Sequence, residues 1–116
     1  GVGLDLPVSE AGVKIESAEA KGITKQMPIG PEQGWEDHVM RVFTVEPGGH
    51  TPHHSHAWPH INYVLAGEGE LSHSGSSSTV QAGSVAYIPG GTEHQFRNTG
   101  NEPLKFICIV PREGEK

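Results

Sequence analysis

Glycine and proline divide this chain into short segments, and their spacing constrains its fold more than any other feature. The 116 residues include 16 glycines and 9 prolines, which fall between runs of β-branched and aromatic residues. Such runs predict strands, and the glycines and prolines between them predict turns. No run predicts a helix longer than one turn. The pattern is typical of an all-β protein built from many short antiparallel strands.

We expect about ten antiparallel strands. Nine of them are predicted at residues 13–16, 23–29, 38–46, 60–66, 68–73, 79–82, 84–88, 94–98 and 104–110. A further extended segment follows a turn at residues 47–49, and the sequence S-G-S-S-S predicts a polar hairpin tip. The expected fold is a single-domain jelly-roll β-barrel over residues 13–116, preceded by a loosely held segment of residues 1–12.

The predicted strand at residues 38–46 is apolar on both faces, with the sequence H-V-M-R-V-F-T-V-E. Side chains of a strand alternate between the two faces of its sheet, so both faces of this strand need a cover. The barrel interior covers one face, and another layer or a second subunit covers the other. We therefore expect a homodimer.

Charge and composition limit the partners of the chain. The formal net charge is −6 with histidine neutral, and this balance does not favour nucleic acid. No apolar run reaches the length of a membrane-spanning helix, so no membrane partner is expected. The single cysteine, Cys108, cannot form a disulfide within the chain, which is compatible with a cytoplasmic location. The expected partner is a small-molecule substrate.

Four of the eight histidines lie in two blocks whose spacing suits a metal ion. The first block reads P-G-G-H-T-P-H-H-S-H-A-W-P-H-I-N-Y at residues 47–63, and the second reads G-S-V-A-Y-I-P-G-G-T-E-H-Q-F-R-N at residues 83–98. An H-x-H pair on an extended segment places both imidazoles on one face. Imidazole is the commonest protein metal ligand and suits Zn, Cu, Fe or Ni. The predicted ligands are His54, His56, His60 and His94.

The two blocks resemble the paired motifs of the cupin superfamily, and the small single-domain cupins with four histidines above all. The matching positions are Gly48, His54, His56 and Gly67 in the first motif, and Gly83, Pro89, Gly91, His94 and Asn98 in the second. The first motif departs at one position, where His60 replaces the usual glutamate ligand. The resemblance implies a jelly-roll barrel with one divalent metal ion per chain, Mn or Fe ahead of Zn, Ni, Cu or Co.

Counting by twos along the strands from the predicted ligands gives the side chains that face the ion. On the last strand either Phe106, Cys108 and Val110 or Ile107 and Ile109 face inward, and the resemblance favours the first set. Packing in the core is an equal alternative for the apolar residues, and Asn98 is expected to serve a turn. The residues expected around a substrate pocket are His50, Trp58, Asn62, Val64, Phe96, Phe106 and Cys108.

Four neutral ligands leave the ion its full charge, which favours anionic ligands or deprotonated substrates. Two further positions on an octahedral ion suit non-haem oxygen chemistry. With the resemblance, this predicts a metal-dependent, dioxygenase-like oxidoreductase that acts on a small organic molecule, with no catalytic residue beyond the metal ligands. Two alternatives stay open, a redox-neutral Lewis-acid enzyme (isomerase, lyase or decarboxylase) and a non-catalytic module that binds a metal or small ligand.

Overall fold

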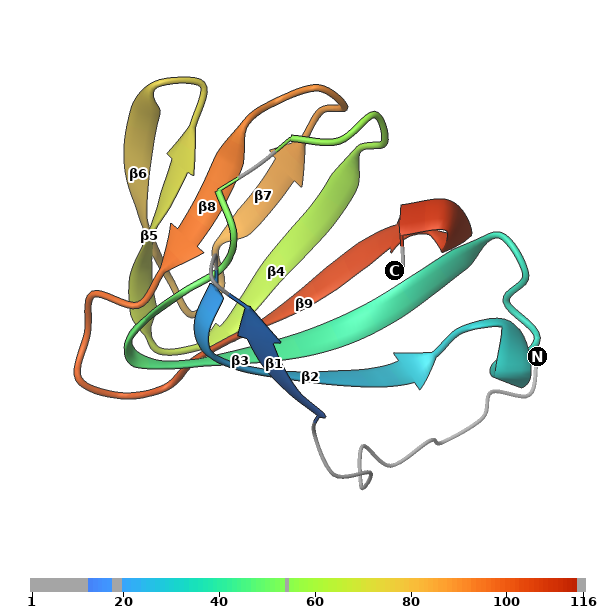
Figure 1. Cartoon of the computed structure of the whole chain (residues 1–116), viewed down its shortest axis with the longest axis horizontal. Coiled ribbons are helices and arrows are strands. Elements are labelled where there is room, and N and C mark those ends of the chain that lie inside the picture. The colour runs from blue at the N-terminus through green and yellow to red at the C-terminus, as the bar shows by residue number, and fades with distance from the viewer. Residues whose placement is uncertain (1–12, 18–19, 54, 115–116) are drawn as a thin grey trace.

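The computed structural model describes residues 13–17, 20–53 and 55–114. These ranges form a nine-stranded antiparallel sheet that curls into a barrel (Figure 1), which confirms the predicted all-β jelly-roll fold. The strands are β1 Val13–Ser17, β2 Ala20–Ile29, β3 His38–His50, β4 His60–Ala66, β5 Glu68–His73, β6 Ser76–Gln81, β7 Val85–Ile88, β8 His94–Arg97 and β9 Leu104–Pro111. Two 3-10 turns, η1 Pro31–Gln33 and η2 Arg112–Gly114, complete the described elements. No described helix is long and apolar enough to cross a membrane.

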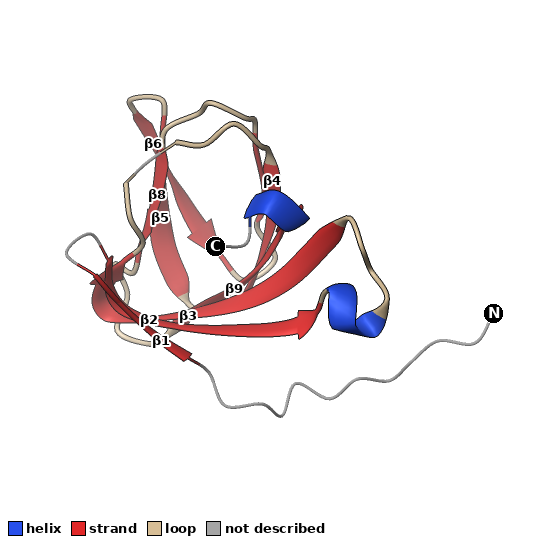
Figure 2. Ribbon diagram, turned by 45° about the vertical axis from the view of Figure 1, so that its right-hand side comes forward, coloured by secondary structure: helices blue, strands red, loops and turns tan. Residues whose placement is uncertain are grey.

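The strand order around the sheet is β6-β5-β8-β3-β9-β4-β7, and β2 joins β3 while β1 joins β2. Figure 2 shows β5, β6 and β8 on one wall, β1, β2, β3 and β9 along the floor, and β4 on the opposite side. The long strand β3 pairs with β9 and β2 along most of its length, and its last residue, His50, pairs with Arg97 of β8. β3 therefore connects the floor of the barrel to the wall that carries β8.

The path of β3 corrects the predicted turn at residues 47–49, because the strand continues through them to His50. Gly48 has a φ of 81°, a left-handed conformation that favours glycine. A Cβ atom on Gly49 would lie 2.4 Å from the Lys21 carbonyl oxygen of β2. The two glycines thus let the strand bend while it stays paired, where a turn would have ended it.

The extended segment expected after this turn is also corrected. Residues 51–53 and 55–59 have no strand structure, and the described sheet has nine strands where about ten were predicted. Pro52 and Pro59 have no N–H to donate to a neighbouring strand, which accounts for the irregular path of this connection. A smaller correction is that β6 begins at Ser76, because the hairpin turns at Ser74 and Gly75.

The core lies between the floor and the walls and shows the alternation of half-buried strands. On β9, Leu104, Phe106, Cys108 and Val110 are buried in the core cluster, and Ile107 and Ile109 face outward. On β3, Val39 and Val45 belong to the same cluster. Val42 is buried as well but lies outside that cluster, so β3 buries apolar side chains on both of its faces. Each fully buried aliphatic or aromatic side chain stabilises the fold by about 1.5–3 kcal/mol.

Candidate metal centre

Three predicted ligands, His56, His60 and His94, meet inside the barrel. His56 lies in the connection between β3 and β4, His60 begins β4, and His94 begins β8. One ring nitrogen of each lies within 4.8 Å of the others, a cluster that can hold a metal ion. The Nε2 atoms of His60 and His94 are 3.0 Å apart. The fourth predicted ligand, His54, lies outside the described residues.

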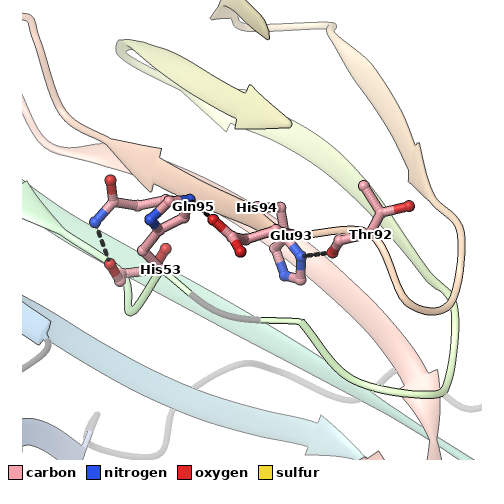
Figure 3. A network of polar contacts seen from close by, with 6 residues as sticks. His53, Thr92, Glu93, His94 and Gln95 are labelled. Carbon is pink, nitrogen blue, oxygen red and sulfur yellow. Dashed lines mark hydrogen bonds and ion pairs between the residues drawn. The ribbon is translucent and has the colours of Figure 1, made fainter. Parts of the chain in front are cut away.

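Backbone carbonyl oxygens set the proton positions of two of these rings. His94 Nδ1 lies 2.9 Å from the Thr92 carbonyl oxygen (Figure 3), and His56 Nδ1 lies 3.3 Å from the Trp58 carbonyl oxygen. A carbonyl oxygen only accepts hydrogen bonds, so each Nδ1 carries the proton and each Nε2 keeps a lone pair. This is the arrangement by which proteins orient histidines toward a metal.

The ring of His60 is set in the same way by a side chain. His60 Nδ1 donates to Asn62 Oδ1 at 2.8 Å, and Asn62 Nδ2 donates to the Ile107 carbonyl oxygen at 3.4 Å. The second bond fixes which end of the amide faces His60. Both His60 and Asn62 are buried, at 5% and 1% exposure.

The donor set fits a divalent metal ion. The Nε2 atoms of His60 and His94 face each other at 3.0 Å, and both are within reach of one ion at metal–nitrogen distances of about 2.0–2.1 Å. Burial, followed by the charges of His94 and His56, lowers the pKa of His60 from 6.5 to about 3. His60 is therefore neutral at physiological pH, as a ligand must be.

A cavity of about 440 Å³ opens beside the three histidines. Its described lining residues are Ile23, Lys25, Arg41, Phe43, Thr51, Pro52, His56, Trp58, His60, Asn62, His94, Phe96, Phe106, Cys108 and Gly114. The volume is within the range of small-molecule sites, about 300–1,000 Å³. The cavity and the histidine cluster thus form one continuous site.

Most of the residues expected around a substrate pocket line this cavity. Trp58, Asn62, Phe96, Phe106 and Cys108 do so. Two others do not, because Val64 is buried in the core and His50 lies against Thr51 and Gln95. The sequence interpretation missed Ile23, Lys25, Arg41 and Phe43. These residues lie on β2 and β3, outside the two histidine blocks, and only strand pairing brings them to the cavity.

Aromatic rings form much of the cavity wall. Phe106 stacks on Phe96 with ring centroids 4.4 Å apart and contacts Phe43 at 5.5 Å. Trp58 stacks on His56, with ring centroids 4.9 Å apart and an angle of 11° between the planes. Gly114 of η2 lies against Trp58, since a Cβ atom there would be 2.6 Å from Trp58 Nε1. The wall offers a ligand mainly apolar contacts.

Hydrogen bonds join the two segments that carry the histidines. The Thr51 N–H donates to the Phe96 carbonyl oxygen, and the Phe96 N–H donates to Thr51 Oγ1, both at 2.9 Å. Figure 3 shows Glu93 turned toward His53, with 2.9 Å between Oε1 and Nε2, while His94 points to Thr92. Glu93 is exposed and directed away from the histidine cluster. These hydrogen bonds hold the segment that carries His56 next to the strand that carries His94.

The role of Asn98 agrees with its predicted place in a turn. Its Nδ2 donates to the carbonyl oxygens of Val45 and Glu102, both at 2.8 Å, and its Oδ1 accepts from the Gly100 N–H at 2.9 Å. These bonds tie the turn after β8 to β3. Asn98 therefore supports the barrel and does not line the cavity.

Comparison with known proteins agrees with this architecture. The 1-methylthio-D-xylulose 5-phosphate methylsulfurylase of Rhodospirillum rubrum is 36% identical over 77 residues, 66% of this chain and 49% of that protein. The oxalate-binding protein of Thermotoga maritima is 34% identical over 65 residues, 55% of this chain and 54% of that protein. The polyketide cyclase RemF of Streptomyces resistomycificus superposes with a TM-score of 0.85 at 27% identity, covering 95% of this chain and 80% of that one.

These matches place the chain in a family without assigning its reaction. The chain spans about half the length of the two curated relatives. The family match covers residues 41–110, which include His56, His60, His94 and the strands that position them. With the jelly-roll fold and the histidine cluster described above, this match shows that the chain belongs to the cupin domain family (Cupin_2).

Proposed function

We propose that the chain is a metal-dependent enzyme that acts on a small organic molecule by redox-neutral chemistry. The ion is held by His54, His56, His60 and His94, with Mn or Fe ahead of Zn, Ni, Cu or Co. The observation that carries the proposal is that an acceptor holds Nδ1 of each of the three described histidines, which leaves three Nε2 lone pairs for one ion.

A bound divalent ion supplies Lewis acidity, which polarises a carbonyl or enolate oxygen of the substrate. The described cavity lining has no Asp or Glu to serve as a general base. The aromatic wall excludes water and packs against the apolar part of the substrate. Asn62 and the Thr92 and Trp58 carbonyls keep the three imidazoles in their orientation.

Redox-neutral chemistry is one of the two alternatives to the oxygenase predicted from the sequence. The polyketide cyclase, which superposes over 95% of this chain, is named for a cyclisation, and neither of the two curated relatives reported above is named for an oxidation. Cyclisation and related carbon–carbon chemistry need a Lewis acid and an apolar enclosure, and the cavity fits that need. The oxygenase stays a prediction that the same experiment tests.

The test begins with metal analysis of protein purified without added metal. The parent chain is expected to hold about one divalent ion, and His54→Ala, His56→Ala, His60→Ala and His94→Ala are each expected to lose most of it. His60→Glu is expected to keep metal, because a carboxylate is also a ligand for these ions. His73→Ala, which removes a histidine hydrogen-bonded to Ser78 in the β5–β6 hairpin, is the matched control. Full metal content in His60→Ala would overturn the four-ligand assignment.

Turnover is then measured with a panel of β-diketones, oxo acids and polyphenols under air and under argon. Equal turnover under both gases supports the redox-neutral proposal. Turnover that stops under argon, with oxygen uptake under air, supports the oxygenase. Stoichiometric metal and ligand binding with no turnover of any compound supports the binding module.

The proposal also includes an oligomeric state and a cellular location for the chain. The outer face of β4 and β7 carries large exposed apolar side chains, and we propose that a second copy of the chain covers them in a homodimer. We also propose a cytoplasmic location, because the sequence has a single cysteine, Cys108, which cannot form a disulfide within the chain. Cell fractionation tests the location.

A further inference from the structure

The charges that line the cavity have one sign. Lys25 and Arg41 line it, whereas no Asp or Glu does so among the described residues. The chain as a whole has 14 acidic residues against 8 Lys and Arg. The positive lining attracts anions into the cavity although the protein as a whole is acidic. A divalent ion held by neutral histidines adds to this positive potential.

Arg41 lies close to the histidine cluster along a row of paired residues. Arg41 of β3 pairs with Cys108 of β9, and Cys108 pairs with Asn62 of β4. Arg41 Nη2 donates to Cys108 Sγ at 3.1 Å, and Cys108 Sγ is 3.5 Å from His60 Nδ1. The guanidinium is thus two contacts away from a metal-binding histidine.

The neighbouring row of paired residues is aromatic and ends at a second cation. Lys25 of β2 pairs with Phe43 of β3, and Phe43 pairs with Phe106 of β9. Phe106 stacks on Phe96, and the Arg41 guanidinium carbon lies 5.0 Å from the centre of the Phe43 ring. A cationic subsite therefore borders an apolar wall inside one cavity.

We propose that the cavity binds a carboxylate that carries a hydrophobic body, with the carboxylate at Arg41 and Lys25 and the body against Phe43, Phe96 and Phe106. This inference rests on the proposed function only in taking the ligand to be its substrate. A guanidinium binds a planar carboxylate through two parallel hydrogen bonds, and stacking on Phe43 pre-orients that fork. A dicarboxylate as small as oxalate has no group to fill the aromatic part of a 440 Å³ cavity.

The test uses three probes, 3-phenylpropanoate, 3-phenylpropan-1-ol and oxalate, and calorimetric binding to the full chain as isolated. The phenyl carboxylate is expected to bind at least about tenfold more tightly than the other two, since a charge-assisted contact to a half-buried guanidinium contributes that much. An equal Kd for the alcohol would overturn the anion subsite. Equal or tighter binding of oxalate would overturn the role of the aromatic wall.

Variants identify the residue that holds the carboxylate. Arg41→Gln is expected to weaken 3-phenylpropanoate about tenfold or more, and Arg41→Lys to weaken it less. Lys105→Gln is the control, because Lys105 lies between the buried Leu104 and Phe106 on β9 and therefore faces outward. It removes the same charge and is expected to change Kd less than about twofold. If Arg41→Gln fails to fold, the Kd of 3-phenylpropanoate for Lys25→Gln is compared with that for Lys105→Gln instead.

Metal content is measured in every sample, so that a failure of the anion subsite can be distinguished from a failure of the proposed metal-dependent function. Loss of binding in Arg41→Gln with metal retained supports the anion subsite whatever the reaction is. Unchanged binding in Arg41→Gln and Lys25→Gln, with loss in His94→Ala, would place the carboxylate on the ion and overturn this inference alone. Absence of metal from the parent chain would overturn the proposed function alone.

Discussion

Asn62 shows how one buried amide decides the chemistry of the site. It holds the proton of His60 at Nδ1 and is itself held by the Ile107 carbonyl oxygen. Without this acceptor, the ring of His60 can carry its proton on Nε2, where it blocks metal binding. The position was found in the sequence by counting two residues from His60, but its partner on β9 depends on strand pairing and could not be found that way.

Substitutions at Asn62 test this role. Asn62→Leu keeps the size of the side chain but removes the acceptor, so metal affinity is expected to fall by about 10–100-fold. Asn62→Asp keeps an acceptor and is expected to retain metal. Competition with a chelator of known affinity measures both variants. Equal metal affinity in Asn62→Leu and the parent chain would contradict the prediction.

The lowered pKa of His60 predicts acid sensitivity of the metal-free chain. The pKa of His60 is about 3 in the folded state, mainly because of burial, against 6.5 when unperturbed. Between these values the unfolded chain binds one more proton than the folded chain, so stability falls as pH falls. The loss of stability is about 1.4 kcal/mol per pH unit between these two values, and His60 causes no loss above pH 6.5.

Urea unfolding of chelator-treated protein at pH 7 and pH 5 measures this effect. The parent chain is expected to lose about 2 kcal/mol more than His60→Gln over this interval, because the variant has no imidazole to protonate there. The difference between the two proteins therefore measures the protonation of His60 together with its coupling to His56 and His94. The same loss in both proteins would rule out His60 as its source.

At the scale of elements, the sequence predicted the strands best where glycine or proline ends them. β1, β4, β5, β7, β8 and β9 match the predicted ranges to within one residue at each end; Gly67 separates β4 from β5, and Pro89 follows β7. The Pro-Gly-Gly sequence at residues 47–49 has the composition of a turn, yet these residues are part of strand β3. Pairing of His50 with Lys21 and Arg97 keeps it extended, and such tertiary pairing is absent from a local pattern.

Close contact of β2 with β3 makes Gly49 sensitive to substitution. In Gly49→Ala, the added Cβ would lie 2.4 Å from the Lys21 carbonyl oxygen and 2.9 Å from the Glu46 carbonyl oxygen. Backbone must shift to relieve the clash, so we expect a loss of about 1–3 kcal/mol in the free energy of unfolding. Gly100→Ala is the control, since its nearest contact is 3.4 Å. Equal stability of the two variants in urea would show that the β2–β3 contact tolerates a methyl group.

At the scale of the whole molecule, the outer face of the sheet is the feature that a monomer does not explain. Ile61, Tyr63 and Leu65 of β4 are 42–47% exposed, and Val85 and Tyr87 of β7 are 63–67% exposed. Ile61 pairs with Tyr87 and Tyr63 with Val85, so these side chains form one patch. The two-sided pattern at residues 38–46 predicted a covered outer face. It did not predict that the patch centres on β4 and β7, because only the strand order brings them together.

Light scattering tests the proposed homodimer. The parent chain is expected at twice its mass of 12.4 kDa, and Tyr63→Glu with Val85→Glu is expected to shift it to 12.4 kDa by placing charges in the interface. Thr79→Glu adds a charge at an exposed position of β6 and is expected to leave the mass unchanged. A parent chain of 12.4 kDa at micromolar concentration would contradict the dimer.

The stacking of Trp58 on His56 gives the molecule an optical reporter of its own metal centre. The indole lies 4.9 Å from an imidazole that can bind the ion, whereas the second tryptophan, Trp35, stacks on His38 and is absent from the cavity lining. A paramagnetic ion at that range quenches indole emission, so Trp35→Phe leaves one fluorophore that reads occupancy directly. Ion entry, exchange and displacement by ligands can then be followed in real time on an unlabelled chain.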